Sequence, residues 1–385
     1  MKLRFLTAGE SHGKALVGIV EGIPAGLELS IKDIQKDLKR RKLGYGRGAR
    51  QKIETDEVEI LTGVRHGKTL GSPITLLIWN KDFKNWEQVM SVAPVPGKVK
   101  REVHIPRPGH ADYVGAVKYN HKDMRNVLER ASARETAMRV GLGGIARKFL
   151  SDLGIDVGSR VCSIGTICDD VKQIGPIKSL NTKTDKSKTR CLTKTAEKKM
   201  VSLIDLAQKN GDTLGGVFEV LAQGVPVGLG SYVHWDKRLE GSIAKSFMSL
   251  NAVKGVEIGL GHQSAGLWGS EVHDEMKLEK SKLTFSSNKT GGIIGGMTSG
   301  EIISVKASMK PIATLMKPLN SVDLRNAKNV KAHVERSDYC AVPAAAVIGE
   351  SLLALCLAEE VLLKFGGDSL EEIRKRVDDW RKISE

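Results

Sequence analysis

The order of strand-like and helix-like segments limits the folds that this chain of 385 residues can adopt. Short segments rich in β-branched and apolar residues predict strands, and several of them follow one another with no helix between them. The predicted strands lie at 3–7, 17–23, 57–64, 72–80, 215–226 and 301–309. A regular alternation of strand and helix, which builds parallel sheets, is missing. The sequence therefore predicts an α+β fold with antiparallel sheets.

The predicted helices have recognisable start signals. Three Ser-x-x-Asp/Glu sequences, beginning at Ser30, Ser132 and Ser369, match the capping box, in which a hydroxyl and a carboxylate satisfy the first free amides of a helix. The predicted helices lie at 31–42, 132–154, 196–212, 343–364 and 370–380. Neither a linker nor a fixed-period repeat divides the chain, so we expect residues 1–385 to form one domain.

Two segments do not match a strand or a helix. Residues 90–113 contain four prolines and predict a long ordered loop, a kind of segment that is often functional. Residues 170–199 are polar and rich in lysine, which is typical of a solvated surface excursion. A tail that binds nucleic acid is the alternative for the second segment.

Composition narrows the partners and the location. The formal net charge of +15 favours anionic partners, although charge does not distinguish nucleic acid, a membrane surface or small phosphorylated molecules. The five cysteines form no C-x-x-C pair and are typical of reduced thiols in the cytoplasm. The longest apolar segment, 341–365, is interrupted by three glutamates, and the apolar run near residue 1 is too short to predict a signal peptide, so we expect no membrane span.

The segment from Gly9 to Gly13 reads G-E-S-H-G and matches the nucleophile elbow of serine hydrolases, G-x-S-x-G. An elbow needs a strand before it and a helix after it, whereas a second strand is predicted after Gly13. A hairpin turn is therefore expected here. The hypothesis that Ser11 is a nucleophile is disfavoured, and His12 becomes the residue of interest.

A second histidine lies in the proline-rich loop, in the segment R-P-G-H-A-D-Y. Pro106 and Pro108 stiffen the backbone around Arg107 and His110, and a histidine in a stiff loop suits a general acid. A rigid turn that carries a surface histidine explains the same pattern. The residues themselves leave both interpretations open.

Arginines at the start of a predicted helix point to an anion. Arg130 and Arg134 flank Ser132, where they oppose the helix dipole, and an anionic ligand would explain this conflict. Weaker signals are the glycines at 291–296, the Lys310-Pro311 pair, and Arg336 beside Asp338, which a surface salt bridge also explains. Metal-ligand spacings such as H-E-x-x-H and nucleic-acid-binding motifs are missing from the sequence, which favours an enzyme that handles a phosphorylated, carboxylated substrate.

Seven blocks, in order along the chain, resemble the chorismate synthase family. They read GESHG, RPGHADY, RASARETAMRV, MSLNAVKGVEIG, GGIIGGMTSGE, KPIAT and ERSDYCAVPAA, and they span residues 9–345. The resemblance implies a β-α-β sandwich with antiparallel sheets packed around central helices, usually as a homotetramer. It implies conversion of 5-enolpyruvylshikimate 3-phosphate to chorismate with loss of phosphate, the last common step of aromatic amino acid biosynthesis. It further implies reduced FMN without net redox change, and no nucleic-acid or membrane partner.

The resemblance also implies roles for individual residues. His12 would act as an acid toward the departing phosphate, His110 would stabilise the anionic reduced flavin, and Asp338 would assist removal of the ring proton through the flavin N5. Substrate or nucleotide phosphate contacts would be Arg41, Arg47, Arg107 and Arg134, with Arg336 as a further anion contact. FMN contacts would be Arg130, Ala131, Ser132, Asn251, Ala252, Gly296, Lys310, Pro311, Ile312, Ala313, Thr314 and Arg336.

The chain departs from the family pattern in a few places. Leu43 stands where Pro is frequent, Ala131 stands where Ser is common, and residues 126–129 replace a glycine-rich lead into Arg130. These changes affect the expected shape of the local loops. They also affect the expected role of Lys42, the third basic position of this region. The chain is short for the branch that reduces its own flavin, so an outside source of reduced FMN is expected, with NADPH as a source of reducing equivalents.

Overall fold

A computed structural model describes residues 2–48, 53–97, 100–171, 174–279, 282–335 and 337–384. The helices are α1 (Ile31–Lys42), α3 (Asp112–Tyr119), α4 (Arg125–Ala131), α5 (Thr136–Asp152), α6 (Ile177–Thr184), α7 (Lys194–Asn210), α8 (Leu239–Met248), α9 (Gly269–Val272), α10 (Val342–Phe365) and α11 (Leu370–Ser384). The strands are β1 (Arg4–Ala8), β2 (Ala15–Glu21), β3 (Val58–Ile60), β4 (Val64–Arg65), β5 (Lys68–Thr69), β6 (Ile74–Trp79), β7 (Asp156–Ile164), β8 (Ile167–Cys168), β9 (Gly216–Gln223), β10 (Val253–Ile258), β11 (Met276–Glu279), β12 (Lys282–Phe285), β13 (Ile293–Ile294), β14 (Met297–Thr298), β15 (Ile303–Met309), β16 (Asn320–Asp323) and β17 (Lys328–Lys331).

Two antiparallel sheets hold most of the longer strands. The first has the order β1-β2-β6-β3, and the second has the order β10-β15-β9-β7-β8. Alternate residues of β6, Ile74, Leu76 and Ile78, are fully buried, as expected for a strand with one face on the core. The predicted α+β class with antiparallel sheets is confirmed.

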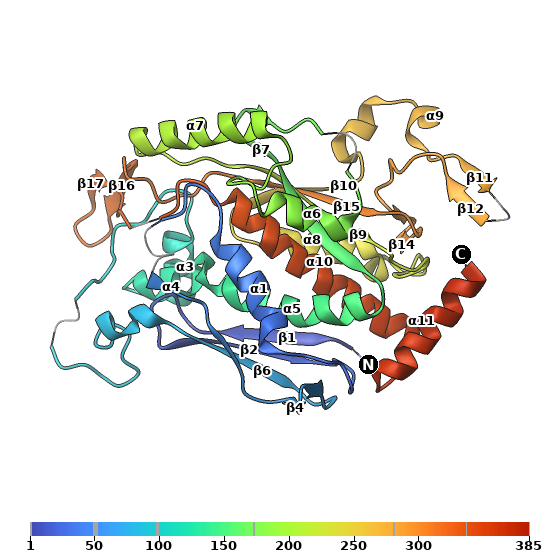
Figure 1. The fold of residues 1–385 in the computed structure, drawn as a ribbon. Helices are drawn as coiled ribbons and strands as arrows, with labels where there is room; N and C mark the ends of the chain where they lie inside the picture. Colours follow the sequence, from blue (N-terminus) through green and yellow to red (C-terminus); the bar gives the residue numbers. More distant parts are fainter. Residues whose placement is uncertain are drawn as a thin grey trace.

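Helices α1, α5 and α10 lie between the two sheets (Figure 1). Helix α5 packs against β2 and β6 on one side and against α10 on the other, while α10 packs against β7 and β9. Gly143 of α5 permits this close approach, because a Cβ there would lie 2.2 Å from Ser351 Cβ of α10. Helix α10 is buried along nearly all of its length, which explains why its sequence is apolar on every side.

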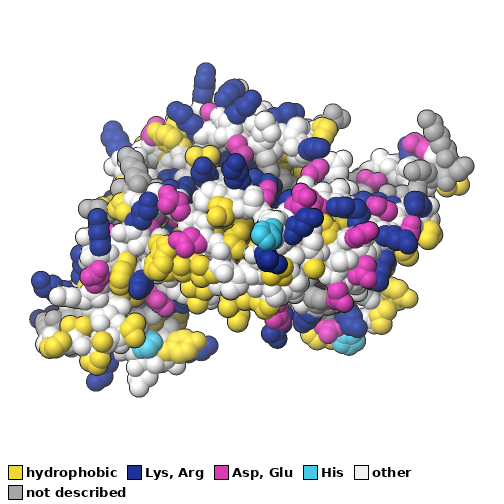
Figure 2. Space-filling model, turned by 60° about the horizontal axis from the view of Figure 1, so that its bottom comes forward, with side chains coloured by type: hydrophobic (Ala, Val, Ile, Leu, Met, Phe, Trp, Pro, Cys, Tyr) yellow, Lys and Arg dark blue, Asp and Glu magenta, His cyan; other side chains and the backbone are white. Residues whose placement is uncertain are grey.

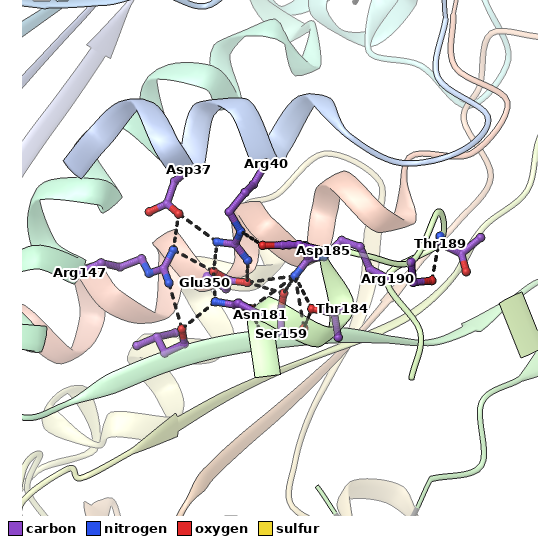
Figure 3. A network of polar contacts seen from close by, with 12 residues as sticks. Asp37, Arg40, Arg147, Ser159, Asn181, Thr184, Asp185, Thr189, Arg190 and Glu350 are labelled. Atoms are coloured by element: carbon purple, nitrogen blue, oxygen red, sulfur yellow. Dashed lines mark hydrogen bonds and ion pairs between the residues drawn. The ribbon is translucent and has the colours of Figure 1, made fainter. Parts of the chain in front are cut away.

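One polar cluster is buried inside this helical layer. Glu350 of α10 is fully buried and accepts hydrogen bonds from both terminal nitrogens of Arg40 at 2.7 Å (Figure 3). Its carboxylate also pairs with Arg147 at 2.9 Å and with Arg190 at 3.4 Å. Burial would raise the pKa of Glu350, but these arginines lower it to about 2. These four residues, which we call the Glu350 cluster, tie α1, α5, α10 and the segment after α6 together.

Several elements differ from the sequence predictions. The structure adds α3, α4, β7, α8 and β10, which were not predicted. Residues 170–199, expected to be a surface excursion, are more buried than their composition suggests: the segment contains α6, and Ile177, Leu180 and Arg190 are buried. The lysines of this segment that the structure describes are exposed, while Ile177, Leu180 and Arg190 reach the interior. Among the helices of the described residues, none has the length and apolar character needed to cross a bilayer.

The outer face of the first sheet is partly apolar. Leu6, Ile19 and Trp79 remain exposed there, although Ile19 and Trp79 lie on strands whose other face is buried. Seen from a direction turned toward this side, hydrophobic side chains gather in patches, and basic and acidic side chains are interspersed around them (Figure 2). The surplus of positive charge is thus not segregated from the acidic residues on this face.

Candidate active site

A cavity of about 420 Å³ brings together segments from across the whole chain. Of the residues predicted from the sequence, the following line it: His12, Arg41, Arg47, Arg107, His110, Ala131, Ser132, Arg134, Asn251, Ala252, Lys310, Ile312, Ala313, Thr314 and Asp338. A volume of this size is typical of a site for a small organic ligand. The fold therefore collects in one place residues up to about three hundred positions apart.

The turn that carries His12 joins β1 to β2. These strands pair antiparallel, with Ala8 opposite Val17, so the expected hairpin is confirmed and the strand-turn-helix context of a nucleophile elbow is missing from this described segment. The Ser11 hydroxyl donates to Ser132 Oγ at 3.0 Å, and the Ser11 amide donates to the Glu129 carbonyl at 2.9 Å. Ser11 therefore joins the hairpin to the α4–α5 junction.

The His12 ring is held on two sides. Its Nδ1 lies 2.9 Å from Glu129 Oε1, and its plane stacks on Trp86 with ring centroids 3.7 Å apart. Glu129 is almost completely buried and also pairs with Arg125 at 3.1 Å. Burial would raise the pKa of Glu129, but the hydrogen bonds from His12 and Arg125 lower it. Glu129 and Trp86 had no signal among the sequence motifs.

His110 has a similar buried carboxylate partner. Its Nδ1 lies 2.6 Å from Asp112 Oδ1, and Asp112 also accepts two hydrogen bonds from the Arg107 guanidinium, at 2.8 and 3.0 Å. Burial opposes ionisation, but the contacts with His110 and Arg107 hold the pKa of Asp112 well below its usual range. The Arg107 Nη1 donates to Thr314 Oγ1 at 2.9 Å. Arg107 thus locks the His110 loop onto the 310–314 segment.

Three arginines surround one end of the cavity. Arg41 and Arg134 both pair with Asp56, and Arg134 also pairs with Glu54 at 3.3 Å. Burial is the main reason why the pKa of Arg41 falls to about 10, and the positive charges of Arg47 and Arg134 add to this effect. Arg47 and Arg134 thus lie close enough to Arg41 to repel its charge, and an anionic ligand would relieve this repulsion.

Asp338 and Arg47 lie together in the cavity wall. Arg47 Nη1 is 3.0 Å from Asp338 Oδ2, and the Gly48 amide donates to Asp338 Oδ1 at 2.6 Å. Arg47 Nε is buried and has no hydrogen-bond partner among the described residues. Because an unsatisfied buried donor is costly, this atom is a further indication of a missing anionic ligand.

Backbone and side-chain hydrogen bonds join the segments that form the cavity wall next to His110. The Lys310 amide donates to the Ala252 carbonyl at 2.9 Å, and the Lys310 ammonium group donates to the Gly109 carbonyl at 3.1 Å. Asn251 donates to the Ala131 carbonyl at 3.0 Å. Ala252 has φ +67°, a strained conformation for alanine that is frequently seen at ligand sites. These contacts join the 109–110, 131, 251–252 and 310–314 segments.

A few predicted residues lie elsewhere. Arg130 turns to the β1 end and donates to the Gly9 carbonyl at 3.0 Å and the Thr7 carbonyl at 2.8 Å, and Pro311 does not line the cavity. Gly296 does not line the cavity either, and its carbonyl accepts a hydrogen bond from the Leu239 amide at the start of α8. Arg336 lies outside the described residues.

Metal binding has no structural support in the ranges that the structure describes. No group of three or more His, Cys, Asp and Glu side chains in those ranges could hold a metal ion. The cavity instead contains arginines, a lysine and imidazoles, which are groups suited to anions.

Comparisons with known proteins match the whole length of the chain. Residues 3–362 match the family model described as chorismate synthase. Chorismate synthases of Listeria welshimeri and Bacillus subtilis are 51% and 49% identical to this chain, each over 99% of both sequences. A solved crystal structure of chorismate synthase superposes with a TM-score of 0.80 at 42% identity, covering 100% of this chain and 98% of its own. The chain belongs to the chorismate synthase family.

Proposed function

We propose that this chain removes phosphate from 5-enolpyruvylshikimate 3-phosphate by 1,4-elimination and so forms chorismate. In this reaction a C–O bond to phosphate and a C–H bond break, and a second ring double bond forms, with no net oxidation. The observation that carries the proposal is the cavity in which His12, His110 and Asp338 meet the arginines Arg41 and Arg47. Membership of the family supports the same reaction.

The arginine end of the cavity suits the phosphate group. Positive charge comes from Arg41, Arg47 and Arg134. The Nε–H group of Arg47 has no hydrogen-bond acceptor among the described residues. Charge-assisted hydrogen bonds of this kind bind phosphate strongly and stabilise the charge that develops as it departs. His12 lies at the same cavity and would donate a proton to the leaving group.

The cavity wall formed by residues 251–252 and 310–314 suits reduced FMN, the cofactor that we propose. The strained Ala252, the Asn251 amide and the Lys310–Thr314 segment form a cradle next to His110, which fits a flat, anionic ligand. When bound, an electron-rich flavin would supply electron density to the carbon from which the phosphate departs. His110 would hold a proton beside the ring system, and Asp338 would accept one from the substrate side.

Other properties belong to the same proposal. We propose that residues 1–385 act as one domain with a β-α-β sandwich architecture, in the cytoplasm, and that NADPH serves an outside reductase that supplies the flavin. The exposed apolar side chains on the first sheet and on α3, where Tyr113, Val114 and Val117 face solvent, support a homotetramer.

The proposal is tested by an anaerobic assay. The full chain is mixed with chemically reduced FMN and 5-enolpyruvylshikimate 3-phosphate, and the release of phosphate and chorismate is followed. We expect equal amounts of both products, and none when FMN is oxidised or omitted. Tight binding of reduced FMN without product would refute the substrate, and binding of DNA or RNA with no affinity for reduced FMN would refute the enzyme class.

A further inference from the structure

The environment of the His12 ring goes beyond what a general acid in a cavity requires. His12 is 9% exposed. Its ring contacts Glu129 through Nδ1 and stacks on Trp86 through its face. The Nε2 atom has no hydrogen-bond partner among the described residues, and His12 lines the cavity. The ring therefore has a protein-facing nitrogen and a free nitrogen.

Glu129 engages His12 at two places. Its Oε1 and Oε2 lie 2.9 and 3.1 Å from Nδ1, and Oε2 accepts the His12 backbone amide at 2.8 Å. A carboxylate that binds both the main chain and the ring of one residue fixes the χ angles of that side chain. Arg125, one helical turn earlier, donates to Glu129 Oε1 at 3.1 Å and keeps the carboxylate in place.

Trp86 restrains the same ring from its face. The His12 and Trp86 rings are 19° from parallel, so the indole limits how far the imidazole can turn. The guanidinium groups of Arg101 and Arg125 lie 4.1 and 5.1 Å from the indole centroid. These cation–π contacts hold Trp86 itself in position.

The charge on Glu129 then decides where the proton of His12 lies. The pKa of Glu129 is lowered against the effect of burial, so the group is an ionised acceptor at neutral pH. An ionised carboxylate accepts hydrogen bonds only, and the nitrogen that faces it must carry hydrogen. A neutral His12 therefore has its proton on Nδ1 and its lone pair on Nε2.

We propose that Glu129 is a positioning residue that holds the Nδ1–H of His12, so that the protonated ring donates its Nε2 proton to the leaving phosphate and is left as the neutral Nδ1–H tautomer. Glu129 does not touch the substrate; it acts through the imidazole. The same logic applies to catalytic histidines whose tautomer is set by a buried acid, where loss of the acid leaves geometry intact but lowers turnover. The catalytic part of this inference rests on the proposed function, whereas the tautomer itself does not.

The tautomer is tested without substrate or flavin. The full-length chain is labelled with ¹⁵N-histidine, and His12 is assigned by the resonance that disappears in His12→Gln. At alkaline pH, where imidazoles are neutral, we expect protonated Nδ1 and bare Nε2 for His12 in the wild-type chain. A wild-type His12 protonated on Nε2 would overturn the proposal, whatever the variants do.

The role in turnover is tested with Glu129→Gln. The Gln amide has one acceptor oxygen for three donors, which are the His12 backbone amide, His12 Nδ1–H and the Arg125 guanidinium. The fraction of His12 with its proton on Nδ1 should therefore fall. We expect kcat to drop about 10- to 100-fold, the scale for loss of a partner that orients an imidazole. KM for the enolpyruvyl phosphate should change less than about 3-fold, because the arginines that bind phosphate are unchanged.

Glu135→Gln is the matched control. Glu135 is also a buried carboxylate paired with an arginine four residues away, Arg139, but it does not line the cavity. We expect a comparable loss of stability, with unchanged His12 resonances and nearly unchanged kcat. Equal losses of kcat in both variants would reduce Glu129 to a structural residue. If the wild-type chain forms no chorismate, the proposed reaction fails, and the tautomer is still decided by the spectra.

Discussion

Replacement of Glu350 by Gln should destabilise the chain strongly, although Gln has nearly the same shape. Glu350 is fully buried and accepts hydrogen bonds from Arg40, Ser159 and Asn181 in addition to its pairs with Arg147 and Arg190. The substitution removes the negative charge at position 350. The guanidinium groups of Arg40, Arg147 and Arg190 then repel one another. Their remaining carboxylate partners, Asp37 and Asp185, are shared among them.

The magnitude follows from two independent arguments. A carboxyl whose pKa falls from 4.5 in the unfolded chain to about 2 in the folded protein contributes about 3 kcal/mol of stability at neutral pH. Removal of one partner from a buried ion pair costs about 3–5 kcal/mol in general. We therefore expect Glu350→Gln to lower the free energy of unfolding by about 3–5 kcal/mol at pH 7.

The sign of the pH dependence gives a second readout. Because folding depresses the pKa of Glu350, its contribution is fully present above about pH 4.5 and is lost as the pH falls toward 2. The difference in unfolding free energy between wild type and Glu350→Gln should therefore shrink as the pH is lowered below about 4.5. Urea unfolding followed by circular dichroism at a series of pH values measures it.

Glu360→Gln on the same helix is the control. Burial and the neighbouring Glu359 raise the pKa of Glu360, so its charge is unfavourable in the folded chain and its removal should cost nothing at pH 7. The reasoning is refuted if Glu350→Gln costs less than about 1 kcal/mol, or if the two variants lose the same stability.

Three further predictions concern the cavity. His12→Ala and His110→Ala should each lower kcat at least ~10²-fold, whereas Ser11→Ala should have a much smaller effect; near-normal turnover in both histidine variants would contradict their roles. Asp112→Asn should lower kcat about 10- to 100-fold, because its carboxylate holds the His110 ring, and an unchanged steady-state rate would show that this ring needs no such support. Arg47→Gln should weaken substrate binding about 10- to 100-fold in an equilibrium titration, the value of a lost charge-assisted hydrogen bond, and unaltered affinity would place the phosphate elsewhere.

Local signals in the sequence were sufficient for elements whose ends are stabilised by their own residues. The Asp33 carboxylate accepts the Ser30 amide at 2.9 Å, and Glu372 accepts the Ser369 amide at 3.2 Å, as the capping boxes predict. The box at Ser132 formed only in part: Ser132 Oγ accepts the Arg134 amide, but Glu135 turns to Arg139 and Thr7. A tertiary partner there outweighed the local one.

Strand β7 shows why other elements were not predicted. It contains Asp156, Gly158, Ser159 and Arg160, a polar sequence that does not suggest a buried strand. Ser159 and Arg160 are nevertheless buried, because Ser159 donates to Glu350 and Arg160 pairs with Glu219 at 2.7 Å. Their burial depends on partners far away in the sequence, and such partners cannot be identified from periodicity.

The site was predictable to a similar extent. The motifs and the family resemblance identified His12, His110 and Asp338, which do line one cavity. They did not identify the carboxylates that hold the two imidazoles. Asp112 is two residues from His110 and could have been found by inspection of its motif, whereas Glu129 is 117 positions from His12 and only the fold brings them together.

The basic run that ends α1 explains how the same residue type serves both stability and the site. Consecutive residues on a helix point about 100° apart, so Arg40 and Arg41 face different surroundings. Arg40 enters the Glu350 cluster, while Arg41 donates to Thr136 and pairs with Asp56 at the cavity. A count of charges treats the two arginines alike, yet the carboxylates around Arg40 raise its pKa, whereas burial and the neighbouring arginines lower the pKa of Arg41 to about 10. Because both belong to one helical turn, the Glu350 cluster anchors the backbone that presents Arg41 to the cavity, and the proposed phosphate site depends on the same helix as the stability of the fold.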